Sequence, residues 1–252
     1  MPPPFWGAID AAHTFCEPKY ATSTVVAEFF NALSSFVYMA AGAAMLCRGC
    51  HWKVGAGYAM LIVVGVGSVL FHATMRFTME LCDEVPMLLL IIAFLLGKED
   101  CLDCLSGPAG RRRFRVGSAV AVALSTAAYI HFKVYQIFVI SFTLMVLFLI
   151  ATHFFPSARR RWTPALQTCF ARAVGGIGAG KLVWEAEQRL CAAHPGVWPL
   201  HIAWHVLSCI GGVYATKYNE ELRAIVAIEG TKEAGREPRR SPRLVGAHTK
   251  RH

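Results

Sequence analysis

The sequence predicts an all-α polytopic membrane protein, a bundle of seven transmembrane helices. Three observations predict it: the composition, seven apolar stretches and the placement of basic residues. Of the 252 residues, 55% are hydrophobic and only 16% are charged, whereas a soluble domain carries about 25% charged residues. The mean hydropathy is +0.44. These values favour one bundle of membrane spans with short connections over one or two soluble domains.

Seven apolar stretches are each long enough for a membrane span, which needs about 20 mostly apolar residues in a helix. The sixth stretch carries Arg172, Lys181 and the glycine run GGIGAG, and it is retained because the distribution of positive charge requires it. The predicted spans cover 28–47, 54–73, 80–97, 116–131, 134–153, 165–184 and 200–218.

Basic residues alternate between the connecting segments as the positive-inside rule describes. The odd-numbered loops and the tail are rich in Lys and Arg, whereas each segment on the opposite side holds one basic residue. We therefore expect the odd-numbered loops and the C-terminus in the cytosol and the N-terminus in the lumen or outside the cell. Seven spans fit this alternation, and six would break it. The loop residues on the cytosolic side are Arg48, Lys53, Lys98, Arg111, Arg112, Arg113, Arg115, Arg159, Arg160 and Arg161, and those on the other side are Lys19, Arg76, Lys133 and Arg189.

The chain divides into three predicted parts: a lumenal N-terminal segment (1–27), the seven-helix bundle (28–218) and a basic, flexible cytosolic tail (219–252). The N-terminus lacks the basic start and apolar core of a cleavable signal peptide, so we expect the first span to direct insertion. The net charge of +9 resides in short runs between the spans and in the tail. This pattern is typical of membrane topology, so no nucleic-acid partner is expected.

The run GGIGAGK at 175–181 resembles the start of a phosphate-binding loop. The next residue, Leu182, has no hydroxyl for magnesium, and no strand precedes the run. Repeated glycines within a span more often let two helices approach closely. We therefore predict helix packing at this run.

Three histidines within apolar helices form a candidate metal site, because ionisable residues inside a membrane are costly and indicate function. His201 and His205 are four residues apart, which places both imidazoles on one helix face. The second span runs outward and the seventh starts outside, so His72 lies at a similar depth to this pair. A single intramembrane histidine is more often a hydrogen-bonded packing residue. Three neutral histidines leave a fourth tetrahedral position open, as in a catalytic zinc site.

Two polar residues at the same depth suit hydrolysis at such a metal. Ser68 lies four residues before His72 on one helix face, and Asp83 is near the start of the third span. We predict that Asp83 is the general base for an attacking water and that Ser68 donates a hydrogen bond to the developing oxyanion. Glu84 is a rival base that points about 100° away on the helix. A serine on its own commonly bonds back to its own helix.

These stretches resemble the alkaline ceramidases, seven-helix membrane hydrolases related to the adiponectin receptors. The similar segments are AEFFN at 27–31, GVGSVLFHATMRFTMELCDEVPM at 65–87, residues 184–191 and HIAWH at 201–205, within a resemblance over roughly 5–220. The resemblance implies a zinc amidase of the endoplasmic reticulum or Golgi membrane that cleaves the N-acyl bond of ceramide, releasing a sphingoid base and a fatty acid. It implies zinc ligands at His72, His201 and His205, and catalytic roles for Ser68 and Asp83.

The resemblance also implies a calcium site with Glu17 and Glu28 among its ligands. The sequence departs from the family there: Thr14 replaces an aspartate, Phe15 a tryptophan and Lys19 a neutral or acidic ligand. Calcium prefers six to eight oxygen ligands, and an ammonium group among them is repulsive. These departures argue against calcium binding, and a Lys19–Glu28 pair in place of the ion is the alternative.

The positions of Cys16 and Cys191 allow a disulfide, since both fall on the non-cytosolic side by the charge distribution. The family pairs these two positions, so the resemblance predicts the bond.

Two functions from different classes agree with the sequence. The first is the amidase described above, which acts on a lipid whose chains remain in the bilayer. The second is a lipid-responsive receptor that uses the same cavity with weak or absent turnover, because seven spans with an outside N-terminus also describe receptors. The sequence does not determine the acyl-chain preference or the oligomeric state.

Overall fold

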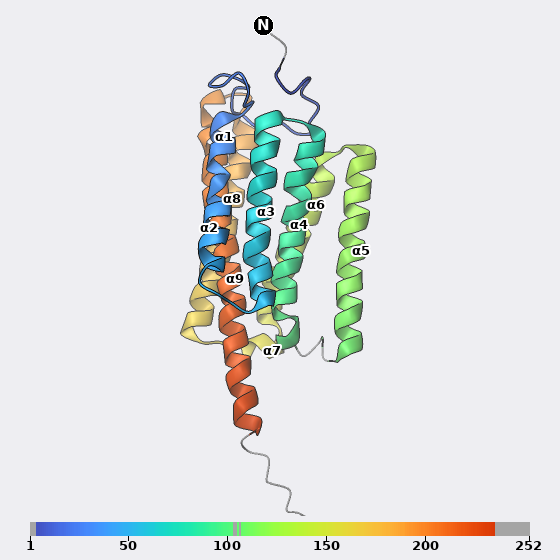
Figure 1. The fold of residues 1–252 in the computed structure, drawn as a ribbon, viewed down its shortest axis with the longest axis vertical. Coiled ribbons are helices and arrows are strands. Elements are labelled where there is room, and N and C mark those ends of the chain that lie inside the picture. The colour runs from blue at the N-terminus through green and yellow to red at the C-terminus, as the bar shows by residue number, and fades with distance from the viewer. Residues whose placement is uncertain (1–3, 103–104, 106, 235–252) are drawn as a thin grey trace, which may run out of the picture.

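The computed structural model describes residues 4–102, 105 and 107–234, and within these ranges the chain is helical with no β-strand. The long helices stand side by side along one axis, and the N-terminal segment lies at one end of the bundle (Figure 1). The helices are α1 (Phe29–Ser34), α2 (Phe36–Leu46), α3 (Trp52–Thr74), α4 (Phe77–Lys98), η1 (Glu99–Cys101), α5 (Pro108–Phe132), α6 (Tyr135–Ala151), η3 (Thr152–Phe154), α7 (Pro156–Arg159), α8 (Pro164–Leu190), η4 (Pro195–Val197) and α9 (Pro199–Ala234).

The predicted membrane character is confirmed. Each of the seven predicted ranges falls on helical structure, the first on α1 together with α2. Within the described part of the chain, four helical segments are long and apolar enough to cross a membrane: Phe29–Leu46, Trp52–Thr74, Tyr135–Phe154 and Pro195–Lys232. The other three predicted ranges lie in α4, α5 and α8, helices that carry several charged side chains each.

Short sequence signals set where the helices begin and end. Pro164 occupies the first turn of α8, where a missing N–H costs nothing, and the Thr163 hydroxyl accepts a hydrogen bond from the Leu166 N–H. At the C-terminal ends of α3 and α5, the cap residues Met75 and Lys133 adopt left-handed backbone conformations (φ +51° and +52°), which end the two helices. The chain therefore reverses sharply after each of these helices.

The first predicted span is interrupted at Ser35, between α1 and α2. The hydroxyls of Ser34 and Ser35 both donate to the Asn31 carbonyl oxygen, at 3.0 and 2.8 Å. Serine hydroxyls that bond back to the preceding turn weaken and bend a helix. The interruption leaves two serines side by side at the depth of the histidines.

Helices α8 and α9 pack closely through the glycine run, as predicted. A Cβ atom added to Gly176 would lie 2.7 Å from the Gly211 nitrogen and 2.8 Å from the Leu207 carbonyl oxygen. The two backbones are therefore almost in contact, which only small residues permit. The run is continuous helix within α8, so it forms no phosphate-binding loop.

Helix α9 continues to Ala234, beyond residue 218 where the predicted bundle ends, and extends past the end of the other helices (Figure 1). The Arg161 side chain fastens this extension through an ion pair of 2.8 Å with Glu229. Residues 235–252 of the predicted tail lie outside the described residues.

Candidate metal centre

The three predicted histidines converge. His72 lies in the last turn of α3, and His201 and His205 lie in the first turns of α9. Each histidine offers one ring nitrogen as a ligand atom, and these three nitrogens all lie within 4.8 Å of one another. Each side chain is only 1–2% exposed. A triad of buried neutral imidazoles at this spacing is able to hold a metal ion.

Two buried carboxylates orient two of these rings. The Nδ1 of His72 lies 2.6 Å from a Glu28 carboxylate oxygen, and the Nδ1 of His201 lies 3.0 Å from a Glu187 carboxylate oxygen. Both carboxylates are fully buried. A metal-binding histidine usually donates its second ring N–H to such a carboxylate, which fixes the tautomer and strengthens the ligand. The Nε2 of each ring is left to face an ion, so these residues fit a metal.

The third ring is held by a hydroxyl. The Nδ1 of His205 lies 2.7 Å from the Ser34 hydroxyl, and the neighbouring Ser35 hydroxyl lies 2.9 Å from that of Ser68. The interruption between α1 and α2 supplies both serines. All three rings therefore have an engaged Nδ1, and their partners come from the two ends of α1 and from α8.

Ser68 and Asp83 line one cavity together with His201 and His205. Ser68 is 2% exposed and Asp83 9% exposed, so both side chains are buried. Glu84 lines the same cavity, so the rival base is also near the site. The structure thus brings together every residue that was predicted to act at the metal.

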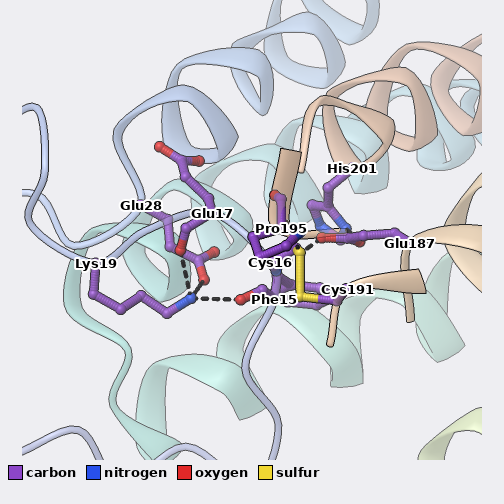
Figure 2. Close-up of a disulfide and its surroundings, with 9 residues drawn as sticks. All are labelled: Phe15, Cys16, Glu17, Lys19, Glu28, Glu187, Cys191, Pro195 and His201. Carbon is purple, nitrogen blue, oxygen red and sulfur yellow. Dashed lines mark hydrogen bonds and ion pairs between the residues drawn. A yellow bond between two sulfur atoms is a disulfide. The ribbon is translucent and has the colours of Figure 1, made fainter. Parts of the chain in front are cut away.

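The N-terminal segment covers this centre. The Phe15 ring packs on the His201 ring with centroids 3.8 Å apart. The predicted disulfide between Cys16 and Cys191 is present, with Cα atoms 5.5 Å apart, and the Cys16 N–H donates to the second oxygen of Glu187 at 2.9 Å. Figure 2 shows the disulfide, Glu187 and His201 next to one another. The segment therefore contributes directly to the support of His201.

The residues expected at a calcium site do not fit a calcium ion. The two carboxylate oxygens of Glu17 accept hydrogen bonds from two N–H groups in the first turn of α1, those of Phe30 and Asn31, each at 2.8 Å. Burial raises the pKa of Glu17, and these two hydrogen bonds oppose the increase. The Lys19 ammonium forms an ion pair with Glu28. The carboxylates therefore already have partners, and a cationic side chain stands among them.

Sequence reasoning missed two supporting residues, Ser34 and Glu187, and the contact of Glu28 with His72. Glu28 and Glu187 are acidic residues near the ends of apolar stretches, and this could have marked them as candidates. The signal for Ser34 was weaker, since it is one of two adjacent serines in an apolar run.

Comparison with known proteins agrees with this centre. The chain is 26% identical to alkaline ceramidase YPC1 of Saccharomyces cerevisiae over 88% of this chain and 80% of that protein. It is 23% identical to the alkaline ceramidase of Arabidopsis thaliana, over 85% and 84% of the two chains, and 31% identical to alkaline ceramidase 3 of Mus musculus, over 38% of each. The sequence model of the family described as Ceramidase matches residues 7–239. Because that match spans most of the sequence, this chain belongs to the ceramidase family.

Proposed function

We propose that this chain is an intramembrane, zinc-dependent amidase that hydrolyses the N-acyl bond of ceramide to a sphingoid base and a free fatty acid. One observation carries the proposal: three buried histidines are each held at Nδ1, and two of them, His201 and His205, share a cavity with Ser68 and Asp83. The family membership supports ceramide as the substrate.

The residues around the centre divide the chemistry between them. A zinc ion held by His72, His201 and His205 would supply a Lewis acid that polarises the amide and activates water. Asp83 accepts a proton from the attacking water and delivers it to the leaving amine. Ser68 donates a hydrogen bond to the oxygen on which negative charge develops. Glu28, Glu187 and Ser34 hold the three rings.

A second, apolar cavity adjoins the first and suits a hydrocarbon chain. It is formed by α2, α3, α4, α6, η3, α8 and α9, and its lining is mostly apolar as far as Lys98, near the opposite end of the bundle. A lipid chain in this cavity would leave its amide group at the metal centre. The two cavities share the lining residues Tyr38, Val64, Met87, Phe142 and Trp204.

The proposed setting is the membrane of the endoplasmic reticulum or the Golgi. Residues 28–218 form seven spans, 1–27 face the lumen and 219–252 face the cytosol. The loops with arginine runs connect helices at one end of the bundle, and the metal centre lies near the other, next to the N-terminal segment. This separation supports an active site toward the lumen. In sealed vesicles with the cytosolic face outward, a tag on the N-terminus should then be protected from added protease, whereas a tag on the C-terminus should be cut.

Replacing His205 with alanine tests the metal centre. His205→Ala should abolish sphingosine release from ceramide by the purified protein and lower its bound zinc. The matched control is His131→Ala, because His131 is an exposed residue in the last turn of α5. Wild-type turnover by the His205 variant would disprove the assignment.

The choice of general base has its own test. Loss of a general base typically lowers the rate by about 10²–10⁴-fold. Asp83→Asn should show a loss of this size in kcat, whereas Glu84→Gln should retain most of the activity. The reverse order would assign the proton transfer to Glu84.

The lipid-responsive receptor remains the second candidate, because the same cavity could retain a lipid without turning it over. Purified protein incubated with excess ceramide separates the two. Many product molecules per protein favour the amidase, and one or fewer favours the receptor.

A further inference from the structure

The Lys19 ammonium group occupies a pocket of oxygen atoms beside the metal centre. Its Nζ donates to the Phe15 carbonyl oxygen at 2.6 Å and to the Glu17 carbonyl oxygen at 2.8 Å, and it forms an ion pair with the Glu28 carboxylate. A lysine ammonium has three N–H donors; two of them have a carbonyl acceptor, and the Glu28 carboxylate is the counter-charge. Figure 2 shows Lys19 reaching across to these oxygens from the N-terminal segment.

The Glu28 carboxylate links this ammonium to a metal-binding ring. Its Oε1 atom faces Lys19, while its Oε2 atom lies 2.6 Å from His72 Nδ1 and accepts from the Asn31 side chain at 3.0 Å. Glu28 is fully buried, whereas the Lys19 side chain is 21% exposed. A buried carboxylate without a counter-charge is costly. Lys19 supplies that charge on the side away from the ring.

The main-chain partners of Lys19 are themselves held in place. Cys16 is covalently bonded to Cys191 and lies between Phe15 and Glu17, whose carbonyl oxygens accept from Nζ. The Glu17 carboxylate caps the start of α1, the helix that follows Glu28. The position of the ammonium is therefore defined by a disulfide, a helix start and two carbonyl groups.

We propose that Lys19 is a positioning residue: a cation tethered to the chain that holds the Glu28 carboxylate aimed at His72, in the place of a soluble divalent cation. The metal centre then assembles without calcium. The inference rests on the proposed metal at the three histidines and is independent of the substrate. Calcium needs six to eight oxygen ligands, whereas the ammonium needs only the contacts found here, with two carbonyl oxygens and one carboxylate.

A structural ion pair and a positioning residue predict different results. If Lys19 only stabilised the fold, its removal would lower the unfolding temperature and leave the zinc affinity of the folded protein unchanged. If Lys19 orients Glu28, its removal weakens the ligand at His72. Loss of a group that supports a metal ligand typically lowers metal affinity by about 10–100-fold.

The experiment compares Lys19→Met with Lys133→Met in the full-length protein in detergent. Lys133 is exposed at the turn between α5 and α6, at the same end of the bundle, so it controls for the loss of one lysine charge. Zinc affinity is measured by competition with a chromogenic chelator in calcium-depleted buffer. We expect Lys19→Met to bind zinc about 10–100-fold more weakly than wild type, and Lys133→Met to match wild type. Unchanged zinc affinity in Lys19→Met overturns the proposal.

Two further arms extend the test, and the first of them keeps the inference testable if Lys19→Met folds poorly, because it uses the wild-type protein. The first adds CaCl₂ to the wild-type protein at about 1 mM, near the weak end of calcium affinities. We expect no change in unfolding temperature or zinc affinity, and an increase in either would contradict the tethered-cation role. The second arm repeats Lys19→Met in a Glu28→Gln background, where it should weaken zinc binding no further. A full additional loss would show that Lys19 does not act through Glu28.

These outcomes are separate from failure of the proposed function. If His205→Ala binds zinc as tightly as wild type, the metal site itself is wrong. If zinc binding depends on both His205 and Lys19 but ceramide is not hydrolysed, the positioning role stands and the amidase activity fails.

Discussion

Replacing Glu187 with glutamine should weaken zinc binding at the metal centre without creating a cavity. One Glu187 oxygen accepts the Cys16 N–H at 2.9 Å and the other faces His201 Nδ1 at 3.0 Å. A glutamine has the same shape but presents an NH₂ group on one side. One of the two contacts then becomes donor against donor, inside a site where the native side chain is fully buried.

The expected loss is about 10–100-fold in zinc affinity, the range for groups that support metal ligands. This corresponds to about 1.4–2.7 kcal/mol, because each tenfold change in affinity is about 1.4 kcal/mol. Competition with a chelator measures it directly. The matched control is Glu185→Gln, since Glu185 is 37% exposed and, within the described ranges, forms its ion pairs along the helix with Lys181 and Arg189. Zinc affinity within twofold of wild type in Glu187→Gln would refute the role of this carboxylate.

Two other predictions concern the chain cavity and the N-terminal segment. Ala215→Phe fills part of the apolar cavity and should lower turnover of long-chain ceramides more than short-chain ones, while the exposed Ala171→Phe should not; equal losses for all chain lengths would contradict this. Burial lowers the pKa of His13 from 6.5 to about 4, so the folded state excludes a proton that the unfolded chain binds. As the pH falls from about 6.5 toward 4, His13 becomes protonated in the unfolded chain but not in the folded one, and the free energy of unfolding therefore decreases. His13→Phe keeps the stacking on Tyr135, and unfolding temperatures should show less acid sensitivity in this variant than in wild type; equal sensitivity would exclude His13 as the source.

The helical membrane fold could be predicted because its signals are local. Apolar runs and interrupting charges are visible within about 20 residues, the length of a span, and the four most apolar segments were all expected. The exact helix ends were not predictable. The interruption at Ser35 depends on two hydroxyls that bond to the Asn31 carbonyl oxygen, and the extension of α9 is held by contacts such as Arg161 with Glu229.

The histidine cluster was also accessible from sequence, because a four-residue spacing fixes one helix face and topology fixes the depth. The disulfide was predicted by family resemblance and is confirmed. The number of spans, the orientation in the membrane and the catalytic roles of Ser68 and Asp83 stay predictions, and the experiments above address the centre.

The sequence by itself determined a helical membrane protein with His72, His201 and His205 at one depth, because hydropathy and helical spacing are properties of neighbouring residues. Only the tertiary structure decided which groups hold those rings. Ser34 meets His205, and Glu187 meets the Cys16 N–H, each across 171 positions of the chain. The sequence suggested a pairing of Lys19 with Glu28, and the tertiary structure shows that two carbonyl oxygens also surround the Lys19 ammonium. Such contacts depend on how distant segments pack and which way single side chains point, and no local pattern encodes that.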